Sequence, residues 1–232
     1  MATRTVGAIL AETSILLDDE QFIRFPKWQL RTWLNEAQRE VSKMTECLRA
    51  KTTLDVDAAD QFITCTTNLI RISEIYWYAD GDSQRYPLVY RDHRASRPIW
   101  GTYRGLNEGY PSLYWTEGYP GAFEIGLYPI PSQNGTLELH YYRYATDREI
   151  MVGTDDALAI DLPNGWEGTV VAWILMRAFQ ASREPTRAES YRNGFNAQVD
   201  MLITASTRYV DEPGSMVEDD WYDIFGDGDE YL

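Results

Sequence analysis

The sequence is poor in the residues that most often carry out chemistry. Its 232 residues include two cysteines, Cys47 and Cys65, and two histidines, His93 and His140. Two cysteines without a CxxC pair form no disulfide framework, so we expect a reducing compartment. His140 falls in an alternating strand pattern, where a packed or surface histidine is the commoner case. We therefore assign no metal or catalytic role to either histidine.

Motifs for enzymatic chemistry are missing as well. The chain has no P-loop, no dinucleotide-binding glycine motif and no nucleophile elbow. The stretch DIFGDGDE, at residues 223–230, lacks the ligand order of a calcium-binding loop. The 36 acidic residues show no positional pattern that would support a hydrolase with dispersed catalytic carboxylates. We predict no enzymatic activity, no cofactor and no metal.

Long hydrophobic runs are also absent. The most apolar run, Val170 to Phe179, is about half as long as the ~20 residues that span a bilayer. The opening residues, MATRTVGAILAETS, have too short an apolar run for a signal peptide. We therefore expect a soluble protein, made in a cytoplasm, that does not contact a membrane.

Positive charge is scarce, since 21 basic residues face 36 acidic ones and give a net charge of -15. From Asp211 to Leu232 there are nine acidic residues and no basic one, so the remaining chain has 27 acidic against 21 basic residues, or -6. Proteins that bind the phosphate backbone need a basic footprint. The composition therefore disfavours a general nucleic-acid binder.

Helical periodicity dominates the first fifty residues. Residues 5–17 place apolar side chains at helical spacing, and Pro26 stands at a second helix start. The apolar residues of that second helix form one stripe: Leu30, Trp33, Leu34, Ala37, Val41, Met44 and Leu48. Because Arg31, Glu36 and Arg39 lie off this stripe, we predict an amphipathic helix with one buried face.

The apolar period changes to two from residue 51 to residue 146, which predicts a run of short antiparallel strands. We interpret Asp80-Gly81-Asp82 and Asn134-Gly135 as turns between them, the second as a hairpin. Helical patterns return afterwards, first with apolar residues on nearly every side and then with a single stripe. The predicted fold is α+β: a helical bundle from residues 1–50 and 147–210, an inserted antiparallel β domain at 51–146, and an acidic, aromatic C-terminal tail at 211–232.

Aromatic residues are abundant, at 13% of the chain. Trp77, Trp115 and Tyr119 stand near predicted turns and are candidates for exposed aromatics. Exposed rings of this kind favour a carbohydrate- or receptor-binding module, or a subunit interface. The alternative is that they fill the core of the β domain at alternate positions.

Three motifs resemble those of the head-to-tail adaptor, or connector, proteins of tailed bacteriophages. The first is WLNEAQ at residues 33–38, and the second runs from Pro120 to Pro131. The third is a late helix pair that carries Arg177, Ala178, Glu184, Arg187, Ala188, Tyr191 and Phe195. The resemblance extends over about residues 5–210. Two departures are Leu127-Tyr128 before the prolines of the second motif, and the acidic tail, which matches no motif of that family.

This resemblance implies a structural protein at the neck of the virion, assembled in the host cytoplasm. It implies a ring, typically of twelve subunits, which sits under the portal protein, extends the DNA channel and offers a platform to the tail or nozzle protein. Genomic DNA would pass through the lumen without sequence-specific binding. The candidates for the subunit interface are Arg31, Glu36, Arg39, Arg183, Arg187, Tyr191 and Arg192.

The acidic tail offers large apolar anchors among its carboxylates. These candidates for docking onto the portal or a neighbouring subunit are Trp221, Tyr222, Ile224, Phe225 and Tyr231. A segment of this composition is expected to fold on a partner. A merely solubilising tail is the alternative, although solubility alone does not need five large apolar residues.

Overall fold

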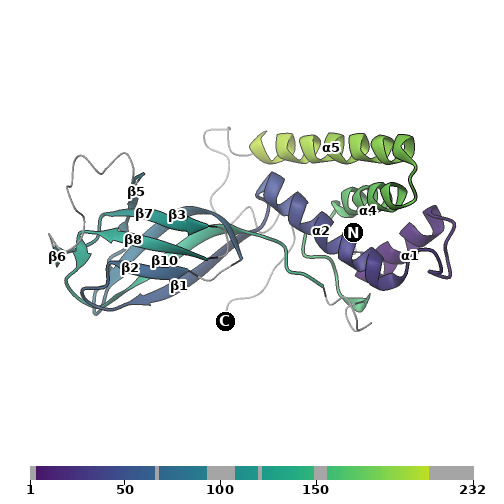
Figure 1. Ribbon diagram of the computed structural model, residues 1–232. Helices are drawn as coiled ribbons and strands as arrows, with labels where there is room; N and C mark the ends of the chain where they lie inside the picture. The colour runs from purple at the N-terminus through teal and green to yellow at the C-terminus, as the bar shows by residue number, and fades with distance from the viewer. Residues whose placement is uncertain (1–3, 66–67, 93–107, 120–121, 149–155, 209–232) are drawn as a thin grey trace. The chain divides into compact units, whose positions relative to one another are not determined.

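A computed structural model describes residues 4–65, 68–92, 108–119, 122–148 and 156–208. The chain divides into two compact units. The helical unit comprises residues 1–48 and 144–232, and the β unit comprises residues 49–143. The described residues are α+β in class, as the sequence predicts (Figure 1).

The described helices of the helical unit are α1 (Val6–Leu16), α2 (Lys27–Thr45), α4 (Glu167–Ala181) and α5 (Pro185–Arg208). The hydroxyl of Thr5 caps α1 by accepting a hydrogen bond from the Ala8 amide at 3.2 Å. Pro26 is the N-cap of α2, one position before the helix, where its missing N–H leaves no donor unpaired. Helix α2 ends at Thr45, and its C-cap, Glu46, has a left-handed backbone conformation.

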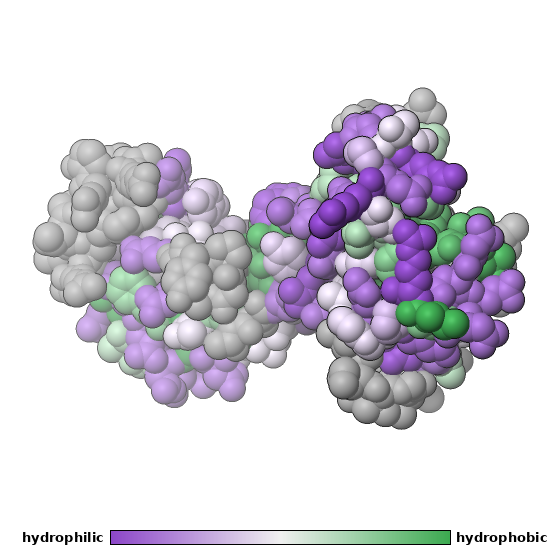
Figure 2. Space-filling model, turned by 45° about the vertical axis from the view of Figure 1, so that its right-hand side comes forward, coloured by the Kyte–Doolittle hydropathy of each residue, from purple (hydrophilic) through white to green (hydrophobic). Residues whose placement is uncertain are grey.

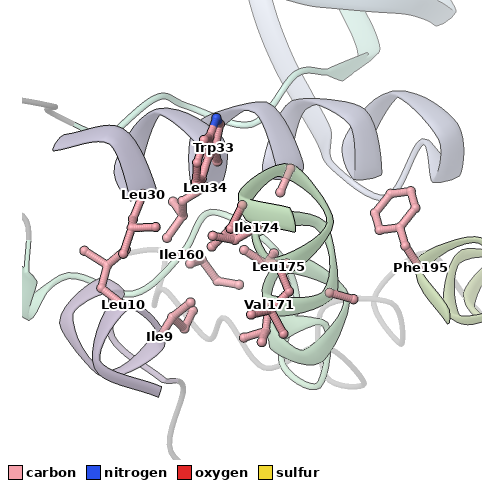
Figure 3. Packing of buried hydrophobic residues seen from close by; sticks show 14 of the residues in the cluster. Ile9, Leu10, Leu30, Trp33, Leu34, Ile160, Val171, Ile174, Leu175 and Phe195 are labelled. Atoms are coloured by element: carbon pink, nitrogen blue, oxygen red, sulfur yellow. The ribbon is translucent and has the colours of Figure 1, made fainter. Parts of the chain in front are cut away.

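Helix α4 supplies the middle of the helical unit's core (Figure 3). Val171, Ile174 and Leu175 of α4 lie within one apolar cluster together with Leu34 of α2 and Phe195 of α5. Ten of the fifteen residues of α4 are buried, which agrees with the apolar pattern all around this helix. The buried stripe of α2 is as predicted from Leu30 to Val41, whereas Met44 is 44% exposed and Leu48 lies beyond the helix.

The described strands of the β unit lie in two four-stranded sheets and one two-stranded sheet. They are β1 (Arg49–Val56), β2 (Phe62–Cys65), β3 (Leu69–Ala79), β4 (Tyr86–Pro87), β5 (Val89–Tyr90), β6 (Glu108–Gly109), β7 (Leu113–Tyr119), β8 (Ala122–Tyr128), β9 (Ile130–Pro131) and β10 (Gly135–Arg143). The orders are β1-β10-β3-β4, β2-β8-β7-β5 and β6-β9. Pairing is antiparallel except for β5 with β7 and β6 with β9.

One predicted turn is present and another is wrong. Gly81 has a φ of +79° in the turn between β3 and β4, which pair antiparallel. Asn134-Gly135 forms no hairpin, because β10 pairs with β1 and β3, and β9 pairs with β6. The Asn134 side chain instead accepts a hydrogen bond from the Ala58 amide at 2.8 Å. At Gly135 a Cβ atom would lie 2.5 Å from Cζ2 of Trp77, so this glycine makes room for an indole ring.

Candidate functional site

Three polar side chains of α2 hold the chain segment that returns from the β unit. Asn35, Gln38 and Ser42 are buried and lie three and four residues apart, on one face of the helix. Gln38 Oε1 accepts a hydrogen bond from the Asp161 amide at 2.6 Å, and Ser42 Oγ accepts one from the Ala145 amide at 3.1 Å. Asn35 and Gln38 of the WLNEAQ motif therefore bind backbone inside the protomer. The spacing of Asn35, Gln38 and Ser42 is the sequence signal for this polar face, which the sequence interpretation missed.

Arg31, one of the predicted candidates for the subunit interface, is buried within the protomer. Its side chain is 3% exposed, and its guanidinium forms an ion pair with Asp156. Lys27 lies 4.0 Å from the same carboxylate. The amphipathic pattern misplaced Arg31 because a long side chain can turn inward when a carboxylate from a distant segment meets it.

Glu36 and Arg39 also have partners within the helical unit. Arg177 Nε of α4 donates a hydrogen bond to Glu36 Oε2 at 2.9 Å. Arg39 donates two hydrogen bonds to the Asp147 carboxylate, both at 2.8 Å. The Arg39 and Asp147 side chains are 54% and 46% exposed, so they remain accessible to a second protein. Both pairs connect α2 to segments more than a hundred residues away.

Helix α5 and the turn before it present the other interface candidates. Arg183 has a φ of +60° in the turn, and its side chain is exposed. Arg187 is 68% exposed and pairs with Glu184, and Arg192 is 53% exposed and pairs with Glu189. Tyr191 is only partly buried and stacks on the Phe179 ring, with ring centroids 5.5 Å apart. The three arginines thus lie at the surface, while part of Tyr191 belongs to the core.

The connection between α1 and α2 is ordered by one buried carboxylate. Asp19 is 8% exposed and accepts hydrogen bonds from three successive backbone amides, those of Ile23, Arg24 and Phe25, at 2.7–3.1 Å. Burial alone would raise the pKa of Asp19, but the hydrogen bonds from Phe25, Arg24 and Ile23 outweigh it and lower that pKa. The loop is therefore held in one conformation by a charged acceptor.

This loop displays apolar side chains to solvent. Ile23 is 83% exposed, although its neighbour Phe25 is buried against Trp33 with ring centroids 5.7 Å apart. Ile15, Leu16 and Trp28 on the flanking helices are 59%, 49% and 52% exposed. Figure 2 shows green apolar residues at the surface of the helical unit among purple hydrophilic ones. We call Ile15, Leu16, Ile23 and Trp28 the apolar edge, a feature absent from the sequence interpretation.

Trp77 and Trp115 are not exposed, which corrects the sequence interpretation. They are 0% and 1% exposed and fill the interior of the β unit. A Cβ atom at Gly126 would lie 2.2 Å from Cε2 of Trp115, and a Cβ atom at Gly135 would likewise overlap Trp77. Each indole therefore packs over a glycine. The side chain of Tyr119 lies outside the described residues. Burial removes the two tryptophans on which a carbohydrate-binding interpretation rested.

Glu138 is the centre of a charged cluster on the sheet that contains β10. Its side chain is 8% exposed and is surrounded by four polar groups: Lys51 at 2.9 Å, Arg85 at 2.7 Å, His140 at 2.8 Å and the Tyr78 hydroxyl at 3.0 Å. Burial would raise the pKa of Glu138, but hydrogen bonds from His140, Lys51 and Tyr78 and the charge of Arg85 outweigh it and lower the pKa to about 2. His140 thus belongs to the hydrogen-bonded network around Glu138.

Among the residues that the structure describes, no group of three or more His, Cys, Asp or Glu side chains is placed to hold a metal ion. No described helix is both long enough and apolar enough to cross a bilayer. The candidate anchors of the tail, Trp221 to Tyr231, and the residue His93 lie outside the described part of the chain.

What the described residues display is thus a set of surfaces: an ordered apolar edge, an arginine-bearing helix and a network of ion pairs. Aromatic and arginine side chains are enriched at protein–protein interfaces. The family model described as SU10 adaptor protein matches residues 4–217. The chain belongs to this family of phage head-to-tail adaptors, which confirms the resemblance found in the sequence. Among curated proteins, none matches the chain.

Proposed function

We propose that the chain assembles into a ring of about twelve subunits under the portal protein at the neck of the virion. The ring extends the DNA channel and offers a platform to the tail or nozzle protein. The family match, which spans both segments of the helical unit and the whole β unit, is the observation that carries this proposal. The work is structural, and it requires surfaces rather than catalysis.

Two surfaces of the helical unit support self-association. A ring needs a heterologous interface, in which one patch meets a different patch on the neighbouring copy. The apolar edge is one such patch, because an isoleucine 83% exposed on an ordered loop is costly to leave in water and loses little entropy on binding. The surface of α5 with Arg183, Arg187 and Arg192 is the other, since arginine is enriched at interfaces.

The acidic character of the chain suits a DNA channel. With a net charge of -15 per copy, a ring of such subunits repels phosphates on average, so that the genome slides through without sequence-specific binding. The tail from Asp211 to Leu232 contributes nine of the acidic residues. We further propose that its apolar anchors dock onto the portal or a neighbouring subunit as the virion assembles in the host cytoplasm.

The direct test is the mass of the assembly, measured by light scattering on the chain alone and with the portal protein of the same phage, followed by negative-stain imaging. A ring with about one copy per portal subunit is expected. The variant Ile23→Asp places a charge on the apolar edge and should prevent the ring, with far-ultraviolet circular dichroism unchanged. Met44→Asp, on an exposed apolar residue of α2, is the matched control and should assemble normally.

Two results would count against this proposal in different ways. A chain that remains monomeric and ignores the portal contradicts the ring. A ring that forms equally well with Ile23→Asp leaves the ring in place but removes the apolar edge from the subunit contact.

A further inference from the structure

One face of the sheet β1-β10-β3-β4 carries an excess of cations over two adjacent rows. Arg49, Tyr142 and Arg71 form the first row, because Tyr142 pairs with both arginines across the two neighbouring strands. Lys51 and His140 belong to the second row, two residues further along β1 and β10 and therefore on the same face. Side chains opposite one another in register point to the same face of the sheet. We call Arg49, Lys51, Arg71 and Tyr142 the basic face.

The geometry of the basic face joins positive charge to an aromatic ring. The guanidinium carbons of Arg49 and Arg71 lie 5.4 Å and 5.0 Å from the centroid of the Tyr142 ring. Arg49 Nη2 also donates a hydrogen bond to the Tyr142 hydroxyl at 3.1 Å. The two rows hold three cations and one carboxylate, that of Glu74, and the Glu138 carboxylate of the next row offsets part of this charge, 2.9 Å from Lys51 Nζ. This surface is locally positive in a chain whose net charge is -15.

A cavity of about 530 Å³ lies beside Arg71, within the size range of small-ligand and side-chain pockets. Its lining includes two tyrosines, Tyr90 and Tyr114, whose ring centroids are 5.4 Å apart, and Tyr90 is 53% exposed. Apolar atoms of Leu69 and Ile72 complete the wall. The cavity is thus suited to an aromatic side chain that arrives together with carboxylates for the neighbouring arginines.

The chain itself contains a segment with this composition. Residues 211–232 hold nine carboxylates and no cation, and Trp221, Tyr222 and Phe225 stand among them. The twenty-four residues that follow Arg208 can extend over about 80 Å. The nine residues of β10 cover about 30 Å, so the segment is long enough to cross the sheet and leave a tether.

We propose that the C-terminal segment of one copy docks on the basic face of a neighbouring copy. Its carboxylates pair with Arg49, Lys51 and Arg71, and one of its aromatic side chains enters the cavity beside Tyr90 and Tyr114. The inference rests on the proposed self-association and names the surface that receives the tail. In a ring, tethering raises the effective concentration of each tail at its neighbour to the millimolar range, so weak individual contacts suffice.

Single-stranded nucleic acid is the competing occupant, because phosphates and bases also suit arginines and tyrosines. One observation favours the tail. The chain as a whole lacks the basic footprint of a nucleic-acid binder, whereas the tail is always present at the stoichiometry of the ring.

A zero-length carbodiimide cross-linker, which joins lysine amines to carboxylates, tests the proposal on the full chain assembled with its portal. The chain has three lysines, Lys27, Lys43 and Lys51, all of them exposed, and only Lys51 belongs to the basic face. Trypsin releases residues 209–232 as one peptide, because no lysine or arginine follows Arg208. Mixing ¹⁵N-labelled with unlabelled chains before assembly distinguishes links between copies from links within one copy.

The expected result is a set of mixed-isotope links between Lys51 and the tail, in excess of tail links to Lys27 and Lys43. The double variant Arg49→Gln, Arg71→Gln should reduce these links about tenfold, since two exposed ion pairs are lost. Arg4→Gln, which removes an exposed arginine of the helical unit, is the control and should leave them unchanged.

Several outcomes overturn the inference while the ring remains: tail links spread equally over the three lysines, links confined to one copy, or links to the portal alone. A fluorescent single-stranded oligonucleotide tests the competing occupant. If it binds the ring and the double variant abolishes this binding while the tail links persist, the face binds nucleic acid instead of the tail. If no ring forms on the portal, the proposed function fails together with this inference.

Discussion

Asn35 and Arg148 exchange two hydrogen bonds across the helical unit. Asn35 Nδ2 donates to the carbonyl oxygen of Arg148 at 2.8 Å, and the Arg148 amide donates to Asn35 Oδ1 at 2.9 Å. The carboxamide of Asn35 thus satisfies both backbone groups of a residue 113 positions away, as a neighbouring strand would. It fixes the place where the chain returns from the β unit to α2.

Replacing Asn35 with aspartate should destabilise the helical unit by about 2 kcal/mol. Aspartate has the same shape but cannot donate, so the Arg148 carbonyl loses its partner and faces a buried negative charge. The free energy of unfolding from urea titration, followed by circular dichroism, measures the loss. Asn196→Asp, at an exposed position of α5, is the matched control and should change stability by less than about 0.5 kcal/mol. Equal losses of unfolding free energy in both variants would show that the two hydrogen bonds between Asn35 and Arg148 add no specific stability.

Gly126→Ala should destabilise the β unit by about 2 kcal/mol or more, because the new Cβ would overlap the Trp115 indole. The emission of the buried tryptophans should shift to longer wavelength if the ring is displaced. Gly194→Ala makes the same chemical change within α5, where no atom lies within 4 Å of the new Cβ. It should stabilise the protein by about 0.5–1 kcal/mol, the difference in helix propensity. Similar effects of the two variants on urea unfolding would contradict the close packing of Trp115.

Acid should weaken the β unit through Glu138. A carboxyl group whose pKa is lowered to about 2 in the folded state, from an ordinary value near 4.5, stabilises the fold above pH 4.5. That contribution disappears as the pH falls from 4.5 to 2, because protonation then favours the unfolded chain. Glu138→Gln should therefore be less stable at pH 7 and should lose less stability over this interval. Parallel urea titrations at pH 7, 4 and 2.5 measure the difference, and identical pH dependence of the two proteins would exclude this role.

Asp19→Asn should loosen the loop that carries Ile23. One neutral oxygen replaces a carboxylate that accepts from three backbone amides, which costs about 2 kcal/mol. Hydrogen exchange at the amides of residues 23–25 should become faster, and assembly on the portal should weaken even though Ile23 is unchanged. Asp18→Asn is the matched control, because Asp18 is exposed and asparagine tolerates its φ of +53°. Unchanged exchange in Asp19→Asn would show that the carboxylate does not order the loop.

Much of the fold is predictable from the pattern of apolar residues. The stripe from Leu30 to Val41 and the largely apolar Glu167–Ala181 segment predict two helices of the helical unit, because an apolar face must be buried. The alternation around Trp77 predicts strand β3. The pattern does not predict partners, so Asn134-Gly135 suggests a hairpin although β10 pairs with strands distant in the sequence. Strand pairing depends on contacts that local periodicity does not encode.

The candidate site was less predictable. Arg31, Trp77 and Trp115 are buried although their positions suggest exposure, and the apolar edge was missed. For the three buried residues a group from another segment decides the outcome: Asp156 meets Arg31, and glycines make room for the indoles. For Ile23 the deciding group is the Asp19 carboxylate, which turns the loop so that Phe25 is buried and Ile23 is not.

The sequence by itself determined the α+β class, the positions of the long helices, the acidic charge of the tail and the membership of the adaptor family, because all of these follow from local order and composition along the chain. Only the tertiary structure decided which polar residues bind inside the protomer and which surfaces remain for a partner. The physical reason is that the burial of a charged or aromatic side chain depends on whether a segment far along the chain brings it a hydrogen-bond acceptor, a counter-ion or an empty space.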